Sequence, residues 1–409
     1  MFKTFLGVGF FNILAAAFGF FLNVIYGKTL SVSDYGDLYF LLSIVYILNY
    51  IIDGGISQSI VVFSSNYNNQ FTPYGYIRFV FNRYSKYLII SSILSIGISS
   101  AIIYFNELLT FQNFVLLFIS GILTSVTKVF ISFFQGEKNW IKFNFSNISL
   151  NFLRLAPLLI ILLLNKSPGI GEITWILILS SLIQFILVAY LLFTNKRELQ
   201  GIKPPSVNYS DTIKKDFSKH FYSLLGITLV TVVASRLDVL ITKQFLSSEE
   251  LGLYSMGSSL ALIFPVMTNS LIQVLLSFSN EINKVNVLTS HLLLKLFAIL
   301  FIAISLFTVI PEVFDWMFDG RYNESIVFFQ FLSLIHIVGL IFTPLEVVFL
   351  VKKPRIIFFL KIAQFLILIL TPLLMIVSLW TILLGVLFSR LAAWLFLTYY
   401  YYDKKLIET

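Results

Sequence analysis

The feature that most constrains this chain is a succession of apolar runs, each about as long as a membrane is thick. Crossing ~30 Å of hydrocarbon takes ~20 helical residues. The runs are continuous rather than alternating, which excludes a transmembrane β-barrel. They predict an all-α integral membrane protein with twelve transmembrane helices, at 5–27, 37–63, 86–105, 112–135, 142–164, 172–194, 220–243, 251–279, 288–310, 325–350, 355–377 and 380–402.

Composition supports a membrane protein and excludes several kinds of site. Hydrophobic residues make up 58% of the chain and charged residues 12%, which is more apolar surface than a soluble core of this length can bury. There is no cysteine, and the three histidines lie far apart in sequence. We therefore expect no metal site and no cofactor.

The positions of lysine and arginine predict how the chain lies in the membrane. With both termini in the cytoplasm, 20 of the 28 Lys and Arg residues fall on the cytoplasmic side and four outside, as expected for cytoplasmic loops. The net charge of +8 therefore reflects topology, and nucleic acid is not an expected partner. The longest loop, the basic segment 195–219, separates an N-terminal lobe, 1–194, from a C-terminal lobe, 220–409, with six helices each.

A short motif recurs at equivalent places in the two halves. "LSVSDYGDLY" at 30–39 precedes the second run, and "LSSEELGLY" at 246–254 precedes the eighth. Both contain Leu-Ser, an acidic residue two positions before a glycine, and then Leu-Tyr. The recurrence predicts two lobes related by a pseudo-two-fold repeat, as in some transporters.

Seven ionisable residues lie well inside the predicted helices, and four of them are cations. A charge at the bilayer centre costs at least ~2.5–3.5 kcal/mol, so each should face the interior of the bundle. Arginine is well suited to bidentate contact with phosphate. The alternative is that these charges pair across helix interfaces, and that two of them, Lys128 and Glu346, snorkel to the cytoplasmic surface. The seven are Asp53, Lys128, Arg154, Arg236, Asp238, Glu346 and Arg390.

Helical spacing gathers polar residues on the same faces as these charges. Asn147 and Asn151 share a face with Arg154, and Asn49 and Tyr50 share one with Asp53. In the seventh helix a stripe contains Asp238, and Arg236 points away from it, so these two should not pair. That stripe comprises Thr231, Ser235, Asp238 and Thr242.

The sequence "IIDGGISQS" at 51–59 interrupts the second apolar run. Each glycine weakens a helix by about 0.8–1 kcal/mol relative to alanine. Gly54 and Gly55 should therefore bend the helix beside Asp53. We expect the Asp53 carboxylate to face a water-filled lumen inside the bundle, where its charge would bias that lumen to open toward the cytoplasm or toward the outside. The alternative is a small-residue packing notch in which Asp53 pairs with Lys128 or Arg154.

Two stretches together resemble a known family. They are "YGKTLSVSDYGDLYFLLSIVYILNYIIDGGISQSIV" in the first half and "SRLDVLITKQFLSSEELGLYSMGSSLALIFPVMTNSL" in the second. Both resemble the polysaccharide-exporter branch of the multidrug/oligosaccharidyl-lipid/polysaccharide superfamily, the Wzx-type flippases of O-antigen and capsule repeat units. The resemblance implies a MATE-like fold in a bacterial inner membrane and a substrate of undecaprenyl-pyrophosphate-linked oligosaccharide. The bilayer, a polymerase and chain-length proteins are the other implied partners.

Under this hypothesis the polar residues divide into two groups. The gating or coupling residues are Asp53, Gly54, Gly55 and Asp238. The residues expected to meet pyrophosphate or sugar are Arg154, Arg390, Arg236, Lys128, Asn147, Asn151, Asn49 and Tyr50.

Two other functions remain as alternatives. A cation-coupled drug or metabolite antiporter of the related multidrug branch should have a net acidic cavity. The seven ionisable residues inside the predicted helices are instead four cations and three acids. A membrane glycan polymerase or ligase typically carries a large outer loop, but the longest outer loop here is about 311–324. No acid/base pair or nucleotide-binding loop appears, so we do not expect an enzyme.

The predicted topology can be tested with reporter fusions. A reporter fused after Lys215 should read cytoplasmic, and one fused after Asp319 should read external, because an even number of spans separates Lys215 from the cytoplasmic N-terminus and an odd number separates Asp319 from it. An alkaline phosphatase fusion is active when the fusion point is external, and a green fluorescent protein fusion is fluorescent when it is cytoplasmic. The opposite reading at either position would contradict the twelve-helix arrangement.

Overall fold

The computed structural model describes residues 2–66, 73–198, 211–266 and 304–402, with the isolated positions 268, 272 and 302. Ten helices in this part of the chain are long and apolar enough to cross a membrane. They correspond to ten of the twelve predicted runs, and the chain is a multi-pass membrane protein. Most of the run 288–310, the end of the run 251–279 and residues 199–210 of the linker lie outside the described residues.

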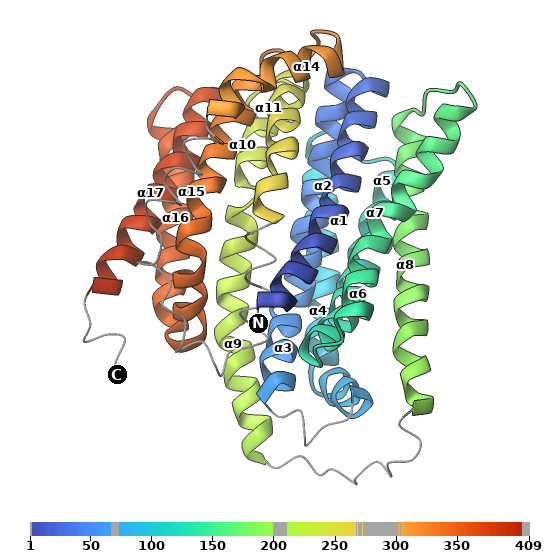
Figure 1. The fold of residues 1–409 in the computed structure, drawn as a ribbon, viewed down its shortest axis with the longest axis vertical. Helices are drawn as coiled ribbons and strands as arrows, with labels where there is room; N and C mark the ends of the chain where they lie inside the picture. Colours follow the sequence, from blue (N-terminus) through green and yellow to red (C-terminus); the bar gives the residue numbers. More distant parts are fainter. Residues whose placement is uncertain are drawn as a thin grey trace.

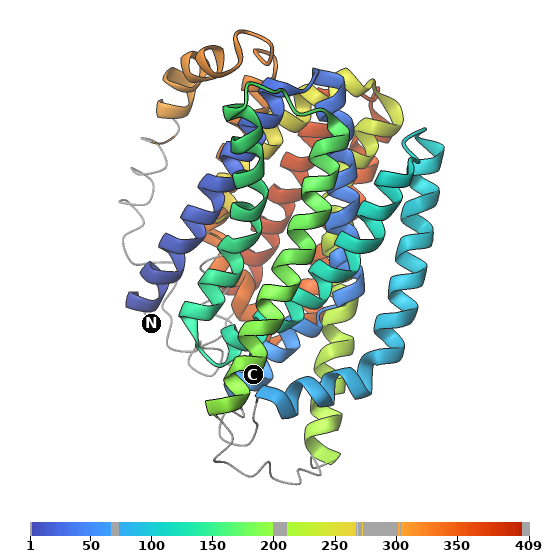
Figure 2. The same ribbon diagram turned by 90° about the vertical axis from the view of Figure 1, so that its right-hand side faces the viewer.

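The helices stand side by side in one elongated bundle (Figure 1), with α14 lying across one end of it (Figure 2). We call this end, which also carries the starts of α2 and α11, the upper end, and the opposite end the lower end. Before the linker the helices are α1 (Phe2–Thr29), α2 (Val32–Asp53), α3 (Ile56–Asn66), α4 (Pro73–Phe105), α5 (Phe111–Val115), the π-helical turn η1 (Leu116–Ser120), α6 (Gly121–Gly136), α7 (Trp140–Leu163) and α8 (Ile170–Glu198). After it they are α9 (Asp211–Ala234), α10 (Leu237–Phe245), α11 (Ser248–Ala261), α14 (Ile310–Phe318), α15 (Ser325–Lys352), α16 (Pro354–Leu374) and α17 (Leu379–Tyr402).

Two predicted runs are interrupted rather than continuous. The run 37–63 is divided at Gly54 and Gly55 into α2 and α3, and the run 220–243 is divided at Ser235 and Arg236 into α9 and α10. The predicted stripe containing Ser235 and Asp238 assumed a continuous helix, so it does not survive the second break. The absence of an ion pair between Arg236 and Asp238 agrees with the expectation, but its cause is the break rather than helical spacing.

The recurring motif marks two helix starts with the same chemistry. Ser31 precedes α2, and its hydroxyl accepts a hydrogen bond from the Asp34 N–H. Ser247 precedes α11 and forms a reciprocal capping box with Glu250. A serine followed three residues later by an acid satisfies N–H groups that a helix start leaves without partners. The residues that the two copies of the motif share therefore form equivalent helix N-caps in the two halves.

The two capped helices pack against each other more extensively than any other described pair except α16 and α17, which pack equally. Their closest approach is at the glycine of each motif, Gly36 and Gly252. A Cβ added at Gly36 would overlap the Ser248 carbonyl oxygen, and one added at Gly252 would overlap the Val32 carbonyl oxygen. Small residues permit such close backbone approach between membrane helices.

A second contact between the two halves lies toward the lower end. Phe217 and Phe221 of α9 are buried against aromatic and aliphatic side chains of α3, α4 and α6. The ring centroids of Phe217 and Phe63 are 5.1 Å apart, and those of Phe221 and Tyr84 are 4.6 Å apart. The helices before and after the linker are thus in contact near both ends of the bundle.

The contact at Gly36 and Gly252 predicts that alanine lowers stability at Gly252 but not at a glycine outside the contact. Gly252→Ala should lower the free energy of unfolding by about 1–3 kcal/mol, because the new methyl group meets backbone atoms that cannot rotate away. Gly97→Ala is the matched control, since its Cβ meets nothing within 4 Å and alanine favours the helix. Thermal unfolding in detergent measures both, and equal unfolding midpoints would contradict the proposed role of the glycine contact.

Candidate functional site

A row of tyrosines on α2 holds two cations from other helices. The guanidinium Nη1 of Arg236 donates a hydrogen bond to the Tyr39 hydroxyl at 2.9 Å, and its carbon lies 4.6 Å from the Tyr46 ring centroid. Arg236 lies at the break between α9 and α10, which brings its side chain toward α2. A guanidinium over an aromatic ring is stabilised electrostatically, more strongly where water is scarce.

The row continues from Tyr46 to Tyr50 and then to Lys128 of α6. The Tyr46 and Tyr50 ring centroids are 4.7 Å apart, and Lys128 Nζ lies 3.1 Å from the Tyr50 ring centroid. Lys128 lies deep in the bundle, yet 32% of its side-chain surface is exposed. Lys128 therefore contacts Tyr50 and Asp53 inside the bundle, and whether its ammonium also reaches the cytoplasmic surface stays a prediction.

Asp53 lies at the end of this row and is enclosed. It is 1% exposed, its Oδ2 lies 3.7 Å from Lys128 Nζ, and its Oδ1 accepts hydrogen bonds from the Ser57 N–H and hydroxyl at 3.0 and 2.5 Å. The expectation that Asp53 faces the lumen is therefore wrong for this conformation. Its pairing with Lys128, the alternative named from the sequence, is what the structure contains.

The break beside Asp53 uses glycine conformations that other residues rarely adopt. Gly54 has φ of 54° and Gly55 has φ of 88°, both in the left-handed region. A Cβ at Gly54 would also overlap the Tyr87 hydroxyl oxygen. That hydroxyl donates a hydrogen bond to the Ile51 carbonyl at 2.7 Å. The helix is fully interrupted here, which is a stronger distortion than a bend.

Asp238 belongs to a neighbouring contact. Its Oδ2 accepts a hydrogen bond from the Tyr254 hydroxyl at 2.6 Å. Its Oδ1 is buried and has no hydrogen-bond partner among the described residues. The carboxylate thus lies near Arg236 without a direct ion pair to it.

Arg154 lies elsewhere, between α7 and α1. Its Nε and the Tyr26 hydroxyl are both buried without hydrogen-bond partners in the described part of the chain. One helical turn away, Asn151 Nδ2 donates to the Ala15 carbonyl at 2.8 Å and so links the two helices. Asn147 is half-buried on the same helix.

Asn49 also links helices, because its side-chain oxygen accepts a hydrogen bond from Thr124 of α6 and its carbonyl accepts one from Ser125. Its amide is therefore used in packing in this conformation.

Arg390 lies in a third group, among the helices after the linker. Lys361 Nζ lies 2.5 Å from Glu346 Oε1, and Lys361 is only 8% exposed. Glu346 therefore pairs inside the bundle instead of snorkelling, which corrects that expectation. Arg390 acts electrostatically on Glu346 and His336, and no ion pair or hydrogen bond joins it to another described residue.

The predicted site residues therefore fall into three groups rather than one. One group, along α2, comprises Lys128, Tyr50, Asp53 and Arg236. Arg154 lies against α1, and Arg390 lies near Glu346 and His336. Sequence reasoning missed Tyr39 as a partner of Arg236, although Tyr39, Tyr46 and Tyr50 recur at helical spacing. In the described residues, no group of three histidine, aspartate or glutamate side chains could hold a metal ion.

The Asp53–Lys128 pair predicts non-additive effects on stability. Lys128→Gln should lower the free energy of unfolding by about 1–3 kcal/mol, less than for a fully buried pair, because it leaves the carboxylate without its counter-charge. Asp53→Asn with Lys128→Gln should cost at least about 0.5 kcal/mol less than the sum of the single changes. Chemical denaturation of the four proteins in detergent measures this coupling. Strict additivity would mean that the two charges do not interact.

Comparison with known proteins agrees with the fold and identifies a family. The polysaccharide biosynthesis protein family matches residues 8–277. No curated protein sequence matches the chain. Among solved structures, the inward closed conformation of the lipid II flippase MurJ is similar, with 15% identity, a TM-score of 0.64, and 98% of this chain and 87% of that chain covered.

Two transporter structures are similar over nearly the whole chain. An inward-facing multidrug resistance MATE family transporter of the MOP superfamily gives 11% identity and a TM-score of 0.65, with 94% of this chain and 93% of that chain covered. A mutant of the Vibrio cholerae MATE transporter VcmN gives 13% identity and a TM-score of 0.58, with 100% and 98% covered. The helical bundle described above is therefore the fold of MurJ and the MATE transporters, and the chain belongs to the polysaccharide biosynthesis protein family.

Proposed function

We propose that this protein moves a polyprenyl-pyrophosphate-linked oligosaccharide, of the O-antigen or capsule type, from the inner to the outer leaflet of the bacterial cytoplasmic membrane. The observation that carries the proposal is the row along α2. Arg236 and Lys128 lie deep in the bundle, half-exposed, and are held by tyrosine rings. Family membership supports the same substrate class.

The physical need for such a row follows from the substrate. Its head group carries a pyrophosphate and a polar glycan, and burial of charge without partners is costly. A cationic interior replaces the hydration that the phosphates lose, and the lipid tail remains in hydrocarbon. One guanidinium group can donate two parallel hydrogen bonds to phosphate oxygens. Tyrosine rings can pack on the faces of sugar rings, and tyrosine hydroxyls can bond sugar hydroxyl groups.

The charge balance of the interior favours an anionic substrate over a cationic drug. The deep cations in the described helices are Lys128, Arg154, Arg236, Lys361 and Arg390, and the deep acids are Asp53, Asp238 and Glu346. Lys128 pairs with Asp53, and Lys361 pairs with Glu346. The three arginines therefore exceed the one remaining carboxylate, and we assign them to pyrophosphate or anionic sugar.

Alternating access requires an element with two arrangements, and we assign that role to the break at Gly54 and Gly55. Asp53 bonds the start of α3 and pairs with Lys128 of α6, so a change in its charge alters both contacts at once. Asp238, bonded to Tyr254 of α11, is the corresponding coupling residue after the linker. The two lobes, 1–194 and 220–409, then move relative to each other about these contacts.

A transport assay with purified protein tests the proposal. Liposomes contain the lipid-linked oligosaccharide, and a membrane-impermeant lectin reports how much glycan reaches the opposite leaflet. Arg236→Ala should lower the initial rate by about tenfold or more, since loss of a charged hydrogen bond of ~1.5–3 kcal/mol corresponds to that factor. Arg154→Ala and Arg390→Ala should also lower it, and lysine at each position should restore it in part.

Arg321→Ala is the matched control. Arg321 is exposed near the upper end and donates a hydrogen bond to the Lys28 carbonyl at 3.2 Å. Its loss should leave the rate unchanged. Wild-type rates for all three interior variants would rule out the phosphate assignment, and a wild-type protein that moves no glycan would rule out the function.

A further inference from the structure

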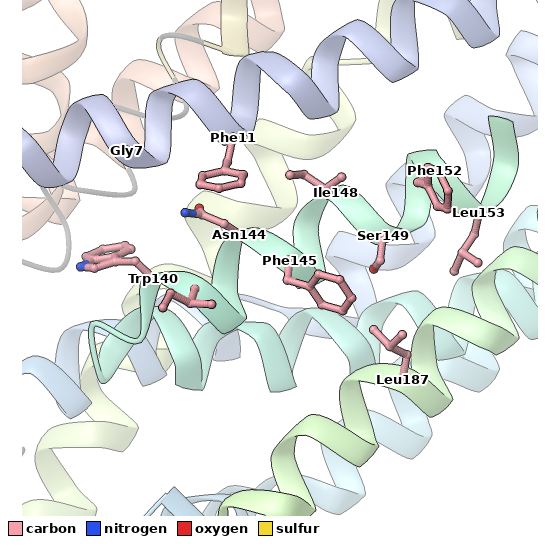
Figure 3. A pocket seen from close by; sticks show the side chains of 11 residues that line it. Gly7, Phe11, Trp140, Asn144, Phe145, Ile148, Ser149, Phe152, Leu153 and Leu187 are labelled. Carbon is pink, nitrogen blue, oxygen red and sulfur yellow. The ribbon is translucent and has the colours of Figure 1, made fainter. Parts of the chain in front are cut away.

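An apolar groove lies on the side of the bundle between α1, α7 and α8 (Figure 3). Its volume is about 750 Å³, within the ~300–1,000 Å³ range of small-molecule sites. In Figure 3, Phe11 of α1 faces α7, and Leu187 of α8 lies beyond the opposite side of that helix. The other walls include Trp140, Phe145 and Phe152 of α7.

The groove is shorter than the hydrocarbon core of a bilayer, which is ~30 Å thick. Its lining residues on α7 run from Trp140 to Leu153, and thirteen residues of helix rise about 20 Å. Trp140 is the first residue of α7, at the lower end. Ile141, Phe145 and Phe152 are 83%, 52% and 52% exposed, so the groove is open to the hydrocarbon around the bundle.

One polar side chain in the wall has no described hydrogen-bond partner. Asn144 is 4% exposed, and its Oδ1 is buried without a partner in the described residues. Asn144 lines the groove one turn above Trp140. A purely apolar occupant would leave this amide unsatisfied, which is unfavourable. The amide therefore points to an occupant with a polar group near the lower end and an apolar part above it.

Two lysines lie close in sequence to Trp140, at the lower end of the groove. Lys138 and Lys142 flank Trp140 in sequence, at the turn between α6 and α7. Burial raises the pKa of Glu137, in the same turn, to about 7, although Lys142 acts in the opposite direction. Near neutral pH this carboxyl is therefore partly protonated, so it offsets less of the positive charge that the two lysines bring to this turn.

We propose that this groove binds the isoprenoid tail of the lipid-linked substrate, with the pyrophosphate at the turn between α6 and α7. The inference rests on the proposed function and specifies where the tail lies before the head group enters the bundle. A single trough along one helix suits a lipid with one chain, whereas bulk phospholipids have two. The two phosphates complement the lysines more strongly than a single phosphate does.

A further feature connects the groove with the interior. Leu153 lines its upper end, and Arg154 is the next residue on α7, with its Nε buried toward α1. The lipid tail can therefore bind the outer side of α1 and α7, while the head group binds the inner side of the same two helices. This contact is one of the most extensive between described helices.

Gly7 offers a direct test because it lines the groove and a Cβ added there meets nothing within 4 Å. Gly7→Leu should therefore place a bulky side chain in the groove with little strain where it joins α1. The probe is an isoprenyl diphosphate with a photoreactive diazirine in its tail, added to protein in phosphatidylcholine nanodiscs. Wild-type protein should be labelled on α1 and α7, and Gly7→Leu should lower this labelling by about tenfold.

Gly9→Leu is the matched control, since its Cβ also meets nothing within 4 Å and Gly9 does not line the groove. It should be labelled like the wild type. Unlabelled isoprenyl diphosphate should compete with the probe, and phosphatidylglycerol at the same concentration should not. Equal competition by phosphatidylglycerol would show a site for bulk lipid, and unchanged labelling of Gly7→Leu would show that the tail binds elsewhere. Either result overturns the proposal.

Transport in the same preparation separates this inference from the proposed function. If the groove holds the tail, Gly7→Leu should lower transport of a long-chain substrate and spare a short-chain analogue, whose tail does not need the groove. If the wild type is labelled in the groove but transports nothing, the proposed function is contradicted and the proposed tail-binding site still stands. Normal transport of both substrates by Gly7→Leu, with unchanged labelling, would contradict only the site.

Discussion

The contact between α2 and α11 is the constraint on which the arrangement of the two halves depends. Their backbones approach so closely at Gly36 and Gly252 that a methyl group at either would overlap carbonyl atoms of the other helix. Lipid offers no hydrophobic drive for helix association, so close packing and polar links must supply it. At the same end, Lys243 Nζ lies 2.6 Å from Asp37 Oδ1 and 2.7 Å from the Ser248 hydroxyl. Close packing and an ion pair together join the two halves at this end.

Much of the fold follows from the sequence because lipid leaves the backbone few choices. A continuous apolar run must form a helix to satisfy its own N–H and C=O groups, and ten predicted runs are helices in the structure. The break at Gly54 was signalled by its two glycines. The break at Ser235 was not, since neither serine nor arginine prevents a helix. Tertiary contacts of Arg236 with Tyr39 and Tyr46 stabilise that break, and no local pattern records them.

The candidate site was less predictable because charge pairing depends on which helices are neighbours. The sequence indicated which charges lie inside the bundle, and the named alternative that Asp53 pairs with Lys128 was correct. It did not indicate that Lys361 crosses to Glu346. Lys361 is one of the 20 cations that the sequence placed on the cytoplasmic side, although it also lies within the predicted run 355–377. The assignment of Arg154, Arg236 and Arg390 to one substrate remains a prediction, since these residues lie in three groups.

The chemistry of the break explains why a carboxylate lies beside two glycines in an apolar segment. Interrupting a helix exposes N–H and C=O groups that lipid cannot satisfy. The end of α2 is satisfied by the Gly54 N–H to the Tyr50 carbonyl and by the Tyr87 hydroxyl to the Ile51 carbonyl. The start of α3 is satisfied by Asp53 through the Ser57 N–H.

A carboxylate is a stronger acceptor than a neutral group for this purpose, but its charge then needs a partner, which Lys128 supplies. The structural and gating readings of Asp53 are therefore compatible. Any movement that straightens α2 and α3 into one helix makes the Asp53 cap unnecessary and frees the carboxylate. Any event that neutralises Asp53 weakens the cap and the ion pair together, so the charge of one side chain is coupled to the shape of the helix.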